Sequence, residues 1–511
     1  MIKLIATLSL LSLIGSSFAI NSDAPALKTP KMQSPIDKLE GLDSLIYRAL
    51  ETFQIPGAAV GIIIDGNVVL AKGYGFRDQA KRLPVTEKTL FGIGSCTKSF
   101  TTNVLAQLVD EGKINWDDPV IKHIPEFRLK DEYATYHVTI RDLLTHQSGL
   151  PRHDLLWYNS SLSRNDLLNR LQYLDLSTDL RGKFQYNNLM YVMTGVLIER
   201  VTGQSWEEAI KSRVFNPLGM NSSNLSVLES QKSDDFSLPY QKKFGSLQAI
   251  PFKDVSVLGP AGSINSNIVD MMKWIGFQMS EGTIEEKPLL KKETLQEMHT
   301  PQVTFRKFPE ETSEMFGYGL GWMVGIHEGS YFVGHPGGVD GFISSTGFLP
   351  KEKIGVVVLT NSDSSMVFAD NLADAIFDRI LGIENDDDWL APKEQRNNKV
   401  RIVSQENQEK NEQLSLSTAR PFSDYIGIFE HPGYGTVRVH TEDDALFASY
   451  DTLSIPFFHK CYDHFIGAVH CFLDMDYNCF FVRDQFGDVT ELHIPMEPAV
   501  EPIVFKRRTA P

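Results

Sequence analysis

The sequence predicts an α+β protein in which an antiparallel sheet is flanked by helices and followed by a small all-β barrel domain. Three observations support this prediction. Runs of small and β-branched residues at 57–64 and 67–70 open the main domain, and strand-like runs return between residues 331 and 360. The residues between them show helical spacing, and short alternating strands follow residue 416. Terminal strands that meet in one sheet around a helical insert give this class of fold.

The first strand pair is predicted by the dipeptide Asp65-Gly66, which separates residues 57–64 from residues 67–70. An Asp-Gly pair between two β-branched runs is a strong hairpin signal. The closing strands are expected at 331–334, 342–348 and 354–360.

Four helices are expected in the middle of the domain. The first covers residues 95–110, where apolar residues recur at helical spacing. The second begins at Thr139, because Asp142 three residues later completes a capping box. Residues 191–201 and 271–275 predict two more. His146 falls in the second helix, and we interpret it as a hydrogen-bonded structural residue rather than as a base or a ligand.

The composition divides the chain into five parts. A basic start, a short apolar core and small residues up to Ala19 are typical of a cleaved secretory signal over residues 1–19. The alternative is a buried N-terminal strand or helix. A flexible leader (20–40) precedes the main domain (41–390), a polar linker (391–416) and the barrel domain (417–511). We therefore expect an exported protein, periplasmic or secreted, without a membrane span.

The charge disfavours two kinds of partner. Acidic residues outnumber basic ones, 65 to 49, and the net charge is -16. This balance disfavours nucleic acid and anionic lipid, since both attract clustered Lys and Arg. No cysteine spacing resembles a zinc site. No metal and no organic cofactor is expected. Cys461, Cys471 and Cys479 allow at most one disulfide among themselves, and we favour buried free thiols.

The first chemical motif is Ser95-Cys96-Thr97-Lys98. Residues three apart share one face of a helix, so the Lys98 amine can reach the Ser95 hydroxyl. Lys98 can act as a base if burial or nearby positive charge lowers its pKa. Ser95 also lies at a helix start, where its N–H can form half of an oxyanion hole. The competing Gly-x-Ser-x-Gly signature fails, because Thr97 stands where its last glycine is needed.

Two further motifs complete a candidate site. In Tyr186-Asn187-Asn188, the phenol can relay a proton, and Asn188 can hydrogen-bond both Lys98 and a substrate amide. The motif His335-Pro336-Gly337-Gly338 follows an expected strand. Its glycines allow close approach of the backbone to a ligand, and the N–H of Gly338 can be the second oxyanion donor. Taken alone, each motif also has a non-catalytic explanation. Ser95 and Lys98 could be a surface pair, Tyr186 could be a packed loop residue, and the glycine motif could be a β-turn.

With these motifs in this order, the chain resembles the penicillin-recognising serine hydrolases. That group includes class C β-lactamases, D,D-carboxypeptidases, D-aminopeptidases and related esterases. The resemblance covers about residues 40–385 and extends to the strings at 143–151, 259–264 and 318–322. It implies a β-lactamase/transpeptidase-like fold, and the last domain is similar to a lipocalin-like barrel. It also implies that homo-oligomers can form.

The resemblance implies a role for each motif residue. Ser95 would be acylated, Lys98 would activate it alone or with Tyr186, and Tyr186 would protonate the leaving group. Asn188, His335 and Gly337 would bind substrate. Ser95 and Gly338 would supply the oxyanion N–H groups. His335 replaces the lysine of the β-lactamases and would carry only a partial charge near neutral pH.

The leading hypothesis is therefore an exported serine hydrolase that acts through an acyl-enzyme on small peptide, amide or ester substrates. One alternative is a β-lactamase of low efficiency. A second, from another class, is a binding or scaffold protein with a vestigial site.

Overall fold

The computed structural model describes residues 37–158, 160–243, 246–305, 313–364, 366–383, 387–390, 420–469 and 475–508. The predicted signal (1–19), most of the leader (20–40), the linker (391–416) and Cys471 lie outside the described residues. No helix in the described ranges combines the length and the hydropathy needed to cross a membrane.

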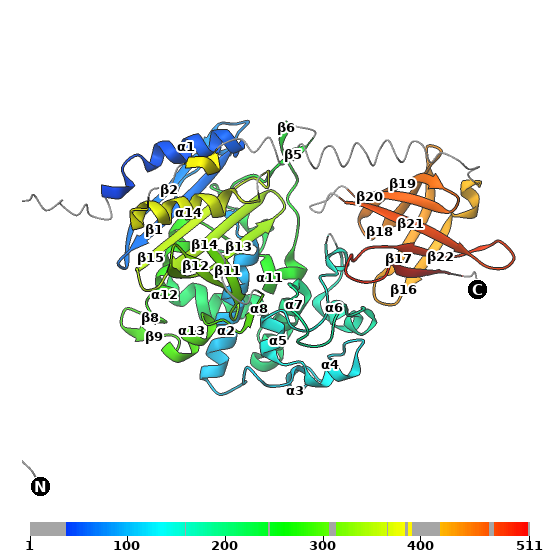
Figure 1. Cartoon of the computed structure of the whole chain (residues 1–511), viewed down its shortest axis with the longest axis horizontal. Helices are drawn as coiled ribbons and strands as arrows, with labels where there is room; N and C mark the ends of the chain where they lie inside the picture. Colours follow the sequence, from blue (N-terminus) through cyan, green and yellow to red (C-terminus); the bar gives the residue numbers. More distant parts are fainter. Residues whose placement is uncertain are drawn as a thin grey trace, which may run out of the picture.

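The predicted α+β architecture is confirmed, with an antiparallel sheet at its centre (Figure 1). The nine strands follow the order β10-β11-β12-β13-β14-β15-β1-β2-β3, so the two ends of the domain's sequence meet where β15 pairs with β1. Their bounds are β1 Gly57–Ile64, β2 Asn67–Asp78, β3 Leu83–Pro84, β10 Val303–Thr304, β11 Glu314–Tyr318, β12 Met323–His327, β13 Ser330–Val339, β14 Phe342–Leu349 and β15 Ile354–Thr360.

The β1–β2 hairpin forms as predicted. Ile64 pairs with Asn67 across the Asp65-Gly66 turn. Asp65 has φ 50° and Gly66 has φ 79°. Both values are positive, as expected for a two-residue turn that matches the twist of the strands.

Both faces of the sheet are covered, and every residue of β1 and β15 is buried. On one face, Val60 of β1 and Val358 of β15 pack against α1 and α14. On the other face, Ala59 and Leu359 belong to the core that contains the remaining helices. Figure 1 shows α1 and α14 on one side of the sheet and α2, α12 and α13 on the other. The main helices are α1 Leu42–Phe53, α2 Thr97–Asp110, α3 Val120–His123, α4 Glu132–His137, α5 Ile140–Leu144, α6 Arg164–Arg170, α7 Asn188–Thr202, α8 Trp206–Ile210, α11 Gly259–Gly262, α12 Ile268–Met279, α13 Lys292–Met298 and α14 Phe368–Leu381.

The predicted helices are present, with local corrections. Thr139 and Asp142 form the expected capping box at the start of α5. However, α5 ends at Leu144, so His146 lies beyond the helix, with φ 59°. The expected 95–110 helix begins with a 3-10 turn, η2 Gly94–Cys96, that leads into α2.

The expected strand at 331–334 is longer than predicted. Strand β13 extends to Val339, so the His335-Pro336-Gly337 motif lies within the strand rather than after it. The reason is the continuous register with β14, in which Gly338 pairs with Ile343.

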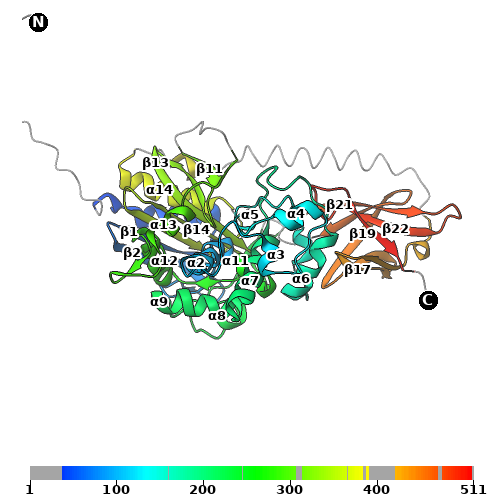
Figure 2. The ribbon, with the colours of Figure 1, turned by 90° about the horizontal axis from the view of Figure 1, so that it is seen from below.

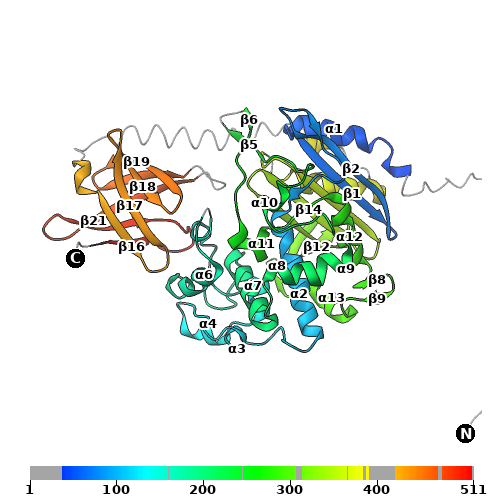
Figure 3. The same ribbon diagram turned by 180° about the vertical axis from the view of Figure 1, so that it is seen from behind.

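The C-terminal part is a closed eight-stranded barrel, as the fold prediction required. Closure occurs where Phe429 of β16 pairs with Arg507 of β23. The strands are β16 Gly427–His431, β17 Gly435–Glu442, β18 Ala445–Tyr450, β19 Leu453–Cys461, β20 His464–Val469, β21 Met475–Arg483, β22 Val489–Ile494 and β23 Ile503–Arg507. The three views show the barrel beside α6 and remote from α1 (Figures 1, 2 and 3).

Candidate active site

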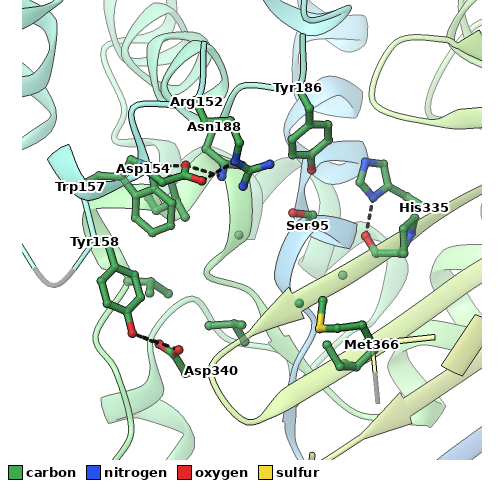
Figure 4. Close-up of a pocket in the computed structure, with 18 of the residues that line it drawn as sticks. Ser95, Arg152, Asp154, Trp157, Tyr158, Tyr186, Asn188, His335, Asp340 and Met366 are labelled. Atoms are coloured by element: carbon green, nitrogen blue, oxygen red, sulfur yellow. Dashed lines mark hydrogen bonds and ion pairs between the residues drawn. The ribbon is translucent and has the colours of Figure 1, made fainter. Parts of the chain in front are cut away.

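The predicted site residues meet at one cavity of about 520 Å³. Ser95, Tyr186, Asn188, His335 and the glycines at 337–338 all line it. Its size lies in the range of small-molecule sites, which are mostly apolar with a few placed polar groups. Figure 4 shows the hydroxyl of Tyr186 directed toward Ser95.

Ser95 is held against β13 by two close backbone approaches. A Cβ on Gly94, which has φ +49°, would lie 2.5 Å from the Gly338 nitrogen. A Cβ on Gly337 would lie 2.0 Å from the carbonyl oxygen of Ile93. Only glycine permits such contacts. The packing therefore brings Ser95 and Gly338 together at one wall of the cavity, where their N–H groups can receive an oxyanion.

Lys98 is fully buried beneath Ser95. Its Nζ lies 3.0 Å from Ser95 Oγ, 2.9 Å from Asn188 Oδ1 and 2.8 Å from the Ala261 carbonyl oxygen. Burial, and then the positive charge of Arg152, lowers the pKa of Lys98 well below its usual value. A neutral amine has two N–H groups for the two carbonyl oxygens, and its lone pair is then directed to the Ser95 hydroxyl. This arrangement is that of a general base on its nucleophile.

The Tyr186 side chain lies next to Ser95 and Lys98. The Lys98 Nζ is 4.9 Å from the Tyr186 ring centroid. Burial raises the pKa of Tyr186, while its hydrogen bond with Ser95 and the charge of Arg152 act in the opposite direction. The net shift is upward, so the phenol is protonated at neutral pH. This favours Lys98 as the base and Tyr186 as a proton donor.

Asn188 links the catalytic lysine to a pair of residues that the sequence analysis missed. Its Oδ1 accepts from Lys98, as predicted, but its Nδ2 donates to Asp154 Oδ1 at 3.3 Å rather than being free for a substrate amide. Asp154 in turn accepts from Arg152 Nε. The available signal was the position of Arg152-His153-Asp154 directly after the family-like segment 143–151.

His335 lies in the cavity wall but carries no charge. Its Nδ1 is 2.6 Å from the Pro336 carbonyl oxygen, and that nitrogen must therefore carry the proton. Its Nε2 accepts from the Tyr318 hydroxyl at 2.9 Å. Burial, and then the charge of Lys98, lowers the pKa of His335 to about 3. The expectation of a partly charged histidine is therefore corrected: packing holds it neutral.

Two buried neighbours support the site without taking part in the chemistry. His146 Nδ1 accepts from the Asn187 N–H at 3.0 Å, and its ring lies 4.3 Å from the Tyr186 ring, in agreement with its interpretation as structural. Burial raises the pKa of the Cys96 thiol to about 11, so it does not compete with Ser95 as a nucleophile.

Cys96, Cys461 and Cys479 are free cysteines. Where the chain is described, no three His, Cys, Asp or Glu side chains group to hold a metal ion.

The barrel reaches the loop that carries Arg152 and Asp154. The His153 N–H donates to Glu497 Oε2 at 2.7 Å, and its Nδ1 is 2.8 Å from the Tyr434 hydroxyl. Both partners belong to the barrel domain. Contacts from the barrel therefore hold His153, which lies between the cavity-lining residues Arg152 and Asp154.

Comparison with known proteins agrees with this geometry. Residues 42–380 match the model of the beta-lactamase family, and residues 412–507 match a domain of unknown function, DUF3471. The first match covers most of the chain, and the chain therefore belongs to the beta-lactamase family. The fold and the motif residues together define a serine hydrolase of the β-lactamase and penicillin-binding-protein type.

Individual relatives support the same class. The unguisins hydrolase ungD' of Aspergillus campestris is 28% identical over 82% of this chain and 80% of its own length. Protein flp of Staphylococcus aureus is 28% identical over 65% of this chain and 64% of its own length. The octameric penicillin-binding protein homologue from Pyrococcus abyssi has a TM-score of 0.61 and 25% identity, and the alignment covers 92% of this chain and 100% of that chain.

Proposed function

We propose that the protein is an exported hydrolase that cleaves small peptide, amide or ester substrates through an acyl-enzyme on Ser95. The observation that carries this proposal is the environment of Lys98. Two carbonyl oxygens accept its N–H groups, and Ser95 Oγ occupies the third position at 3.0 Å.

The geometry supports a two-step reaction. Lys98 takes the proton of Ser95 Oγ as that oxygen attacks the substrate carbonyl, and the N–H groups of Ser95 and Gly338 stabilise the resulting oxyanion. The bond to the leaving group then breaks. Tyr186 donates its proton to the departing oxygen or nitrogen and regains one from Lys98. Water attacks the acyl-enzyme in the second step, with the same proton transfers in reverse.

The neutral His335 favours a peptidase or esterase over an efficient β-lactamase. A lysine at this position would offer a permanent charge to a substrate carboxylate, whereas His335 is engaged by Tyr318 and the Pro336 carbonyl. The apolar side chains of Leu258 and Met323 also line the cavity and suit an apolar acyl group.

The test is turnover of a substrate panel by the mature protein and by Ser95→Ala. The panel contains 4-nitrophenyl esters, D-aminoacyl 4-nitroanilides and nitrocefin. We expect Ser95-dependent release of nitrophenol or nitroaniline, with much slower nitrocefin turnover. Cys96→Ser, which alters the neighbouring thiol, is the matched control and should retain activity.

Other outcomes would favour the alternatives. Nitrocefin as the best substrate would favour the β-lactamase, and turnover that survives Ser95→Ala would refute the acyl-enzyme. Inactivity on the whole panel would favour the scaffold. We also propose that the chain forms homo-oligomers, supported by the octameric relative and testable by light scattering.

A further inference from the structure

One cationic side chain lines the catalytic cavity and takes part in no bond-making, bond-breaking or proton-transfer step of the proposed reaction. Among the described residues that line the cavity, Arg152 is the one whose side chain is positively charged at neutral pH. Lys98 lies below the cavity floor, and His335 is neutral. The remaining wall is largely apolar and includes Trp157 and Phe184, with Asp340 as a second carboxylate besides Asp154. A permanent charge in such a wall needs a partner of opposite sign.

Asp154 satisfies only one part of the Arg152 guanidinium. It accepts from Nε, and within the described part of the chain neither terminal nitrogen of Arg152 donates a hydrogen bond. The side chain keeps 46% of its surface exposed to solvent. An arginine offers its terminal N–H groups as a planar fork that matches the two oxygens of a carboxylate. The terminal N–H groups of Arg152 are therefore the groups suited to bind an anion.

The guanidinium is close to the reacting atoms. Its carbon lies 5.4 Å from the Tyr186 ring centroid, and Tyr186 itself interacts with Ser95. In Figure 4, Arg152 and His335 are on opposite sides of Tyr186. An anion bound by Arg152 would thus lie on the wall opposite His335.

The residues that orient Arg152 are held in place without a ligand. Asp154, which orients its Nε, also accepts from Trp157 Nε1 at 2.8 Å and from Asn188 at 3.3 Å. The intervening residue, His153, is buried and donates its N–H to Glu497 of the barrel. Groups that are already ordered bind a ligand at a smaller entropic cost.

We propose that Arg152 binds a free carboxylate of the substrate, so that the preferred substrates are esters or amides with a carboxylate near the scissile bond. A terminal carboxylate on a short acyl chain and the C-terminus of a small peptide share this chemistry. This inference rests on the proposed function, because it assigns the substrate class of the same site. Asp154 is a positioning residue in this account.

The test compares two esters of equal chain length, mono-4-nitrophenyl glutarate and methyl 4-nitrophenyl glutarate, which differ in one charge. The wild type should have the higher kcat/KM for the anionic ester. Arg152→Gln should reduce the anionic-to-neutral ratio by about 10- to 100-fold, the usual effect of losing a charge-assisted hydrogen bond, and Arg152→Lys should restore part of it. The ratio is the readout because Arg152 also lowers the pKa of Lys98, an effect that both esters share.

Arg438→Gln is the matched control, since it removes one exposed positive charge from β17 of the barrel and should leave the ratio unchanged. A wild-type ratio near one, or an equal loss for both esters in Arg152→Gln, would overturn the inference.

Binding measured without turnover separates this inference from the proposed function. Ser95→Ala should bind mono-4-nitrophenyl glutarate in calorimetry, and Ser95→Ala/Arg152→Gln should bind it at least about 10-fold more weakly. Equal binding by the two variants would refute the carboxylate site, whatever the role of Ser95. Turnover that persists in Ser95→Ala would refute the acyl-enzyme and leave the binding comparison valid.

Discussion

Asn188 offers a direct way to change the pKa of the base that the structure assigns. Its Oδ1 accepts a hydrogen bond from Lys98 Nζ at 2.9 Å. Asn188→Asp keeps the shape of the side chain and places a carboxylate at this position. A neighbouring negative charge stabilises the ammonium form, so the pKa of Lys98 should rise. Because Lys98 acts as a base only when neutral, the acid limb of kcat/KM should move to higher pH.

The size of this shift follows from the contact distance. At an effective dielectric constant of about 20, two unit charges ~3 Å apart interact by about 5 to 6 kcal/mol, or about 4 pH units. Solvent and the existing hydrogen bond reduce this value, and carboxylates beside cations in proteins shift pKa values by about 1 to 3 units. We therefore expect the limb to move by about 1 to 3 pH units, with activity recovered at alkaline pH.

The assay is the pH dependence of kcat/KM for a nitrophenyl ester. Asn188→Ala should lower the rate without moving the limb upward, because it removes the acceptor and adds no charge. Asn188→Asp/Asp154→Asn keeps the total charge of the site and should still shift the limb upward, but by less, because the Asp154 carboxylate itself raises the pKa of Lys98. An acid limb that stays in place, or moves to lower pH, would refute the assignment of a neutral Lys98 as the base.

Three further predictions concern the leaving group, the oxyanion wall and the barrel. Tyr186→Phe should lower kcat for an anilide by about 10²- to 10⁴-fold and kcat for a nitrophenyl ester much less, since only the anilide needs a proton donor; equal losses would contradict this role. Gly337→Ala places a Cβ 2.0 Å from a carbonyl oxygen, so Tm and activity should both fall, whereas Gly276→Ala, with its nearest neighbour at 3.7 Å, should keep both. Glu497→Ala leaves the buried N–H of His153 unpaired, at a cost of about 1 to 3 kcal/mol in folding stability. Calorimetry should show a lower Tm, and kcat/KM for an anionic ester should fall. An unchanged kcat/KM would show that the barrel contact does not support the pocket.

Local features of the site could be predicted from the sequence. Ser95 and Lys98 are three residues apart, so helical geometry alone brings them together, and the contact of 3.0 Å agrees. The capping box at Thr139 and the Asp65-Gly66 hairpin are equally local. In each case the residues that make the contact also define the pattern.

Features that depend on distant segments could not be derived in this way. The contact of Gly94 with Gly338 joins residues far apart in the chain, and no local pattern in the sequence places these two glycines together. Arg152 went unnoticed because nothing near it in sequence shows that its side chain lies over Tyr186. The charge of His335 was misjudged for a related reason: the burial and the Tyr318 hydrogen bond that hold it neutral come from tertiary packing.

The central claim is that Ser95 is the nucleophile, and covalent labelling tests it most directly. The mature protein and Ser95→Ala would be incubated with a fluorophosphonate, and the intact mass and the labelled peptide would be measured. The account predicts one adduct that maps to Ser95 and is absent from the variant. An adduct at another residue, or equal labelling of Ser95→Ala, would contradict it.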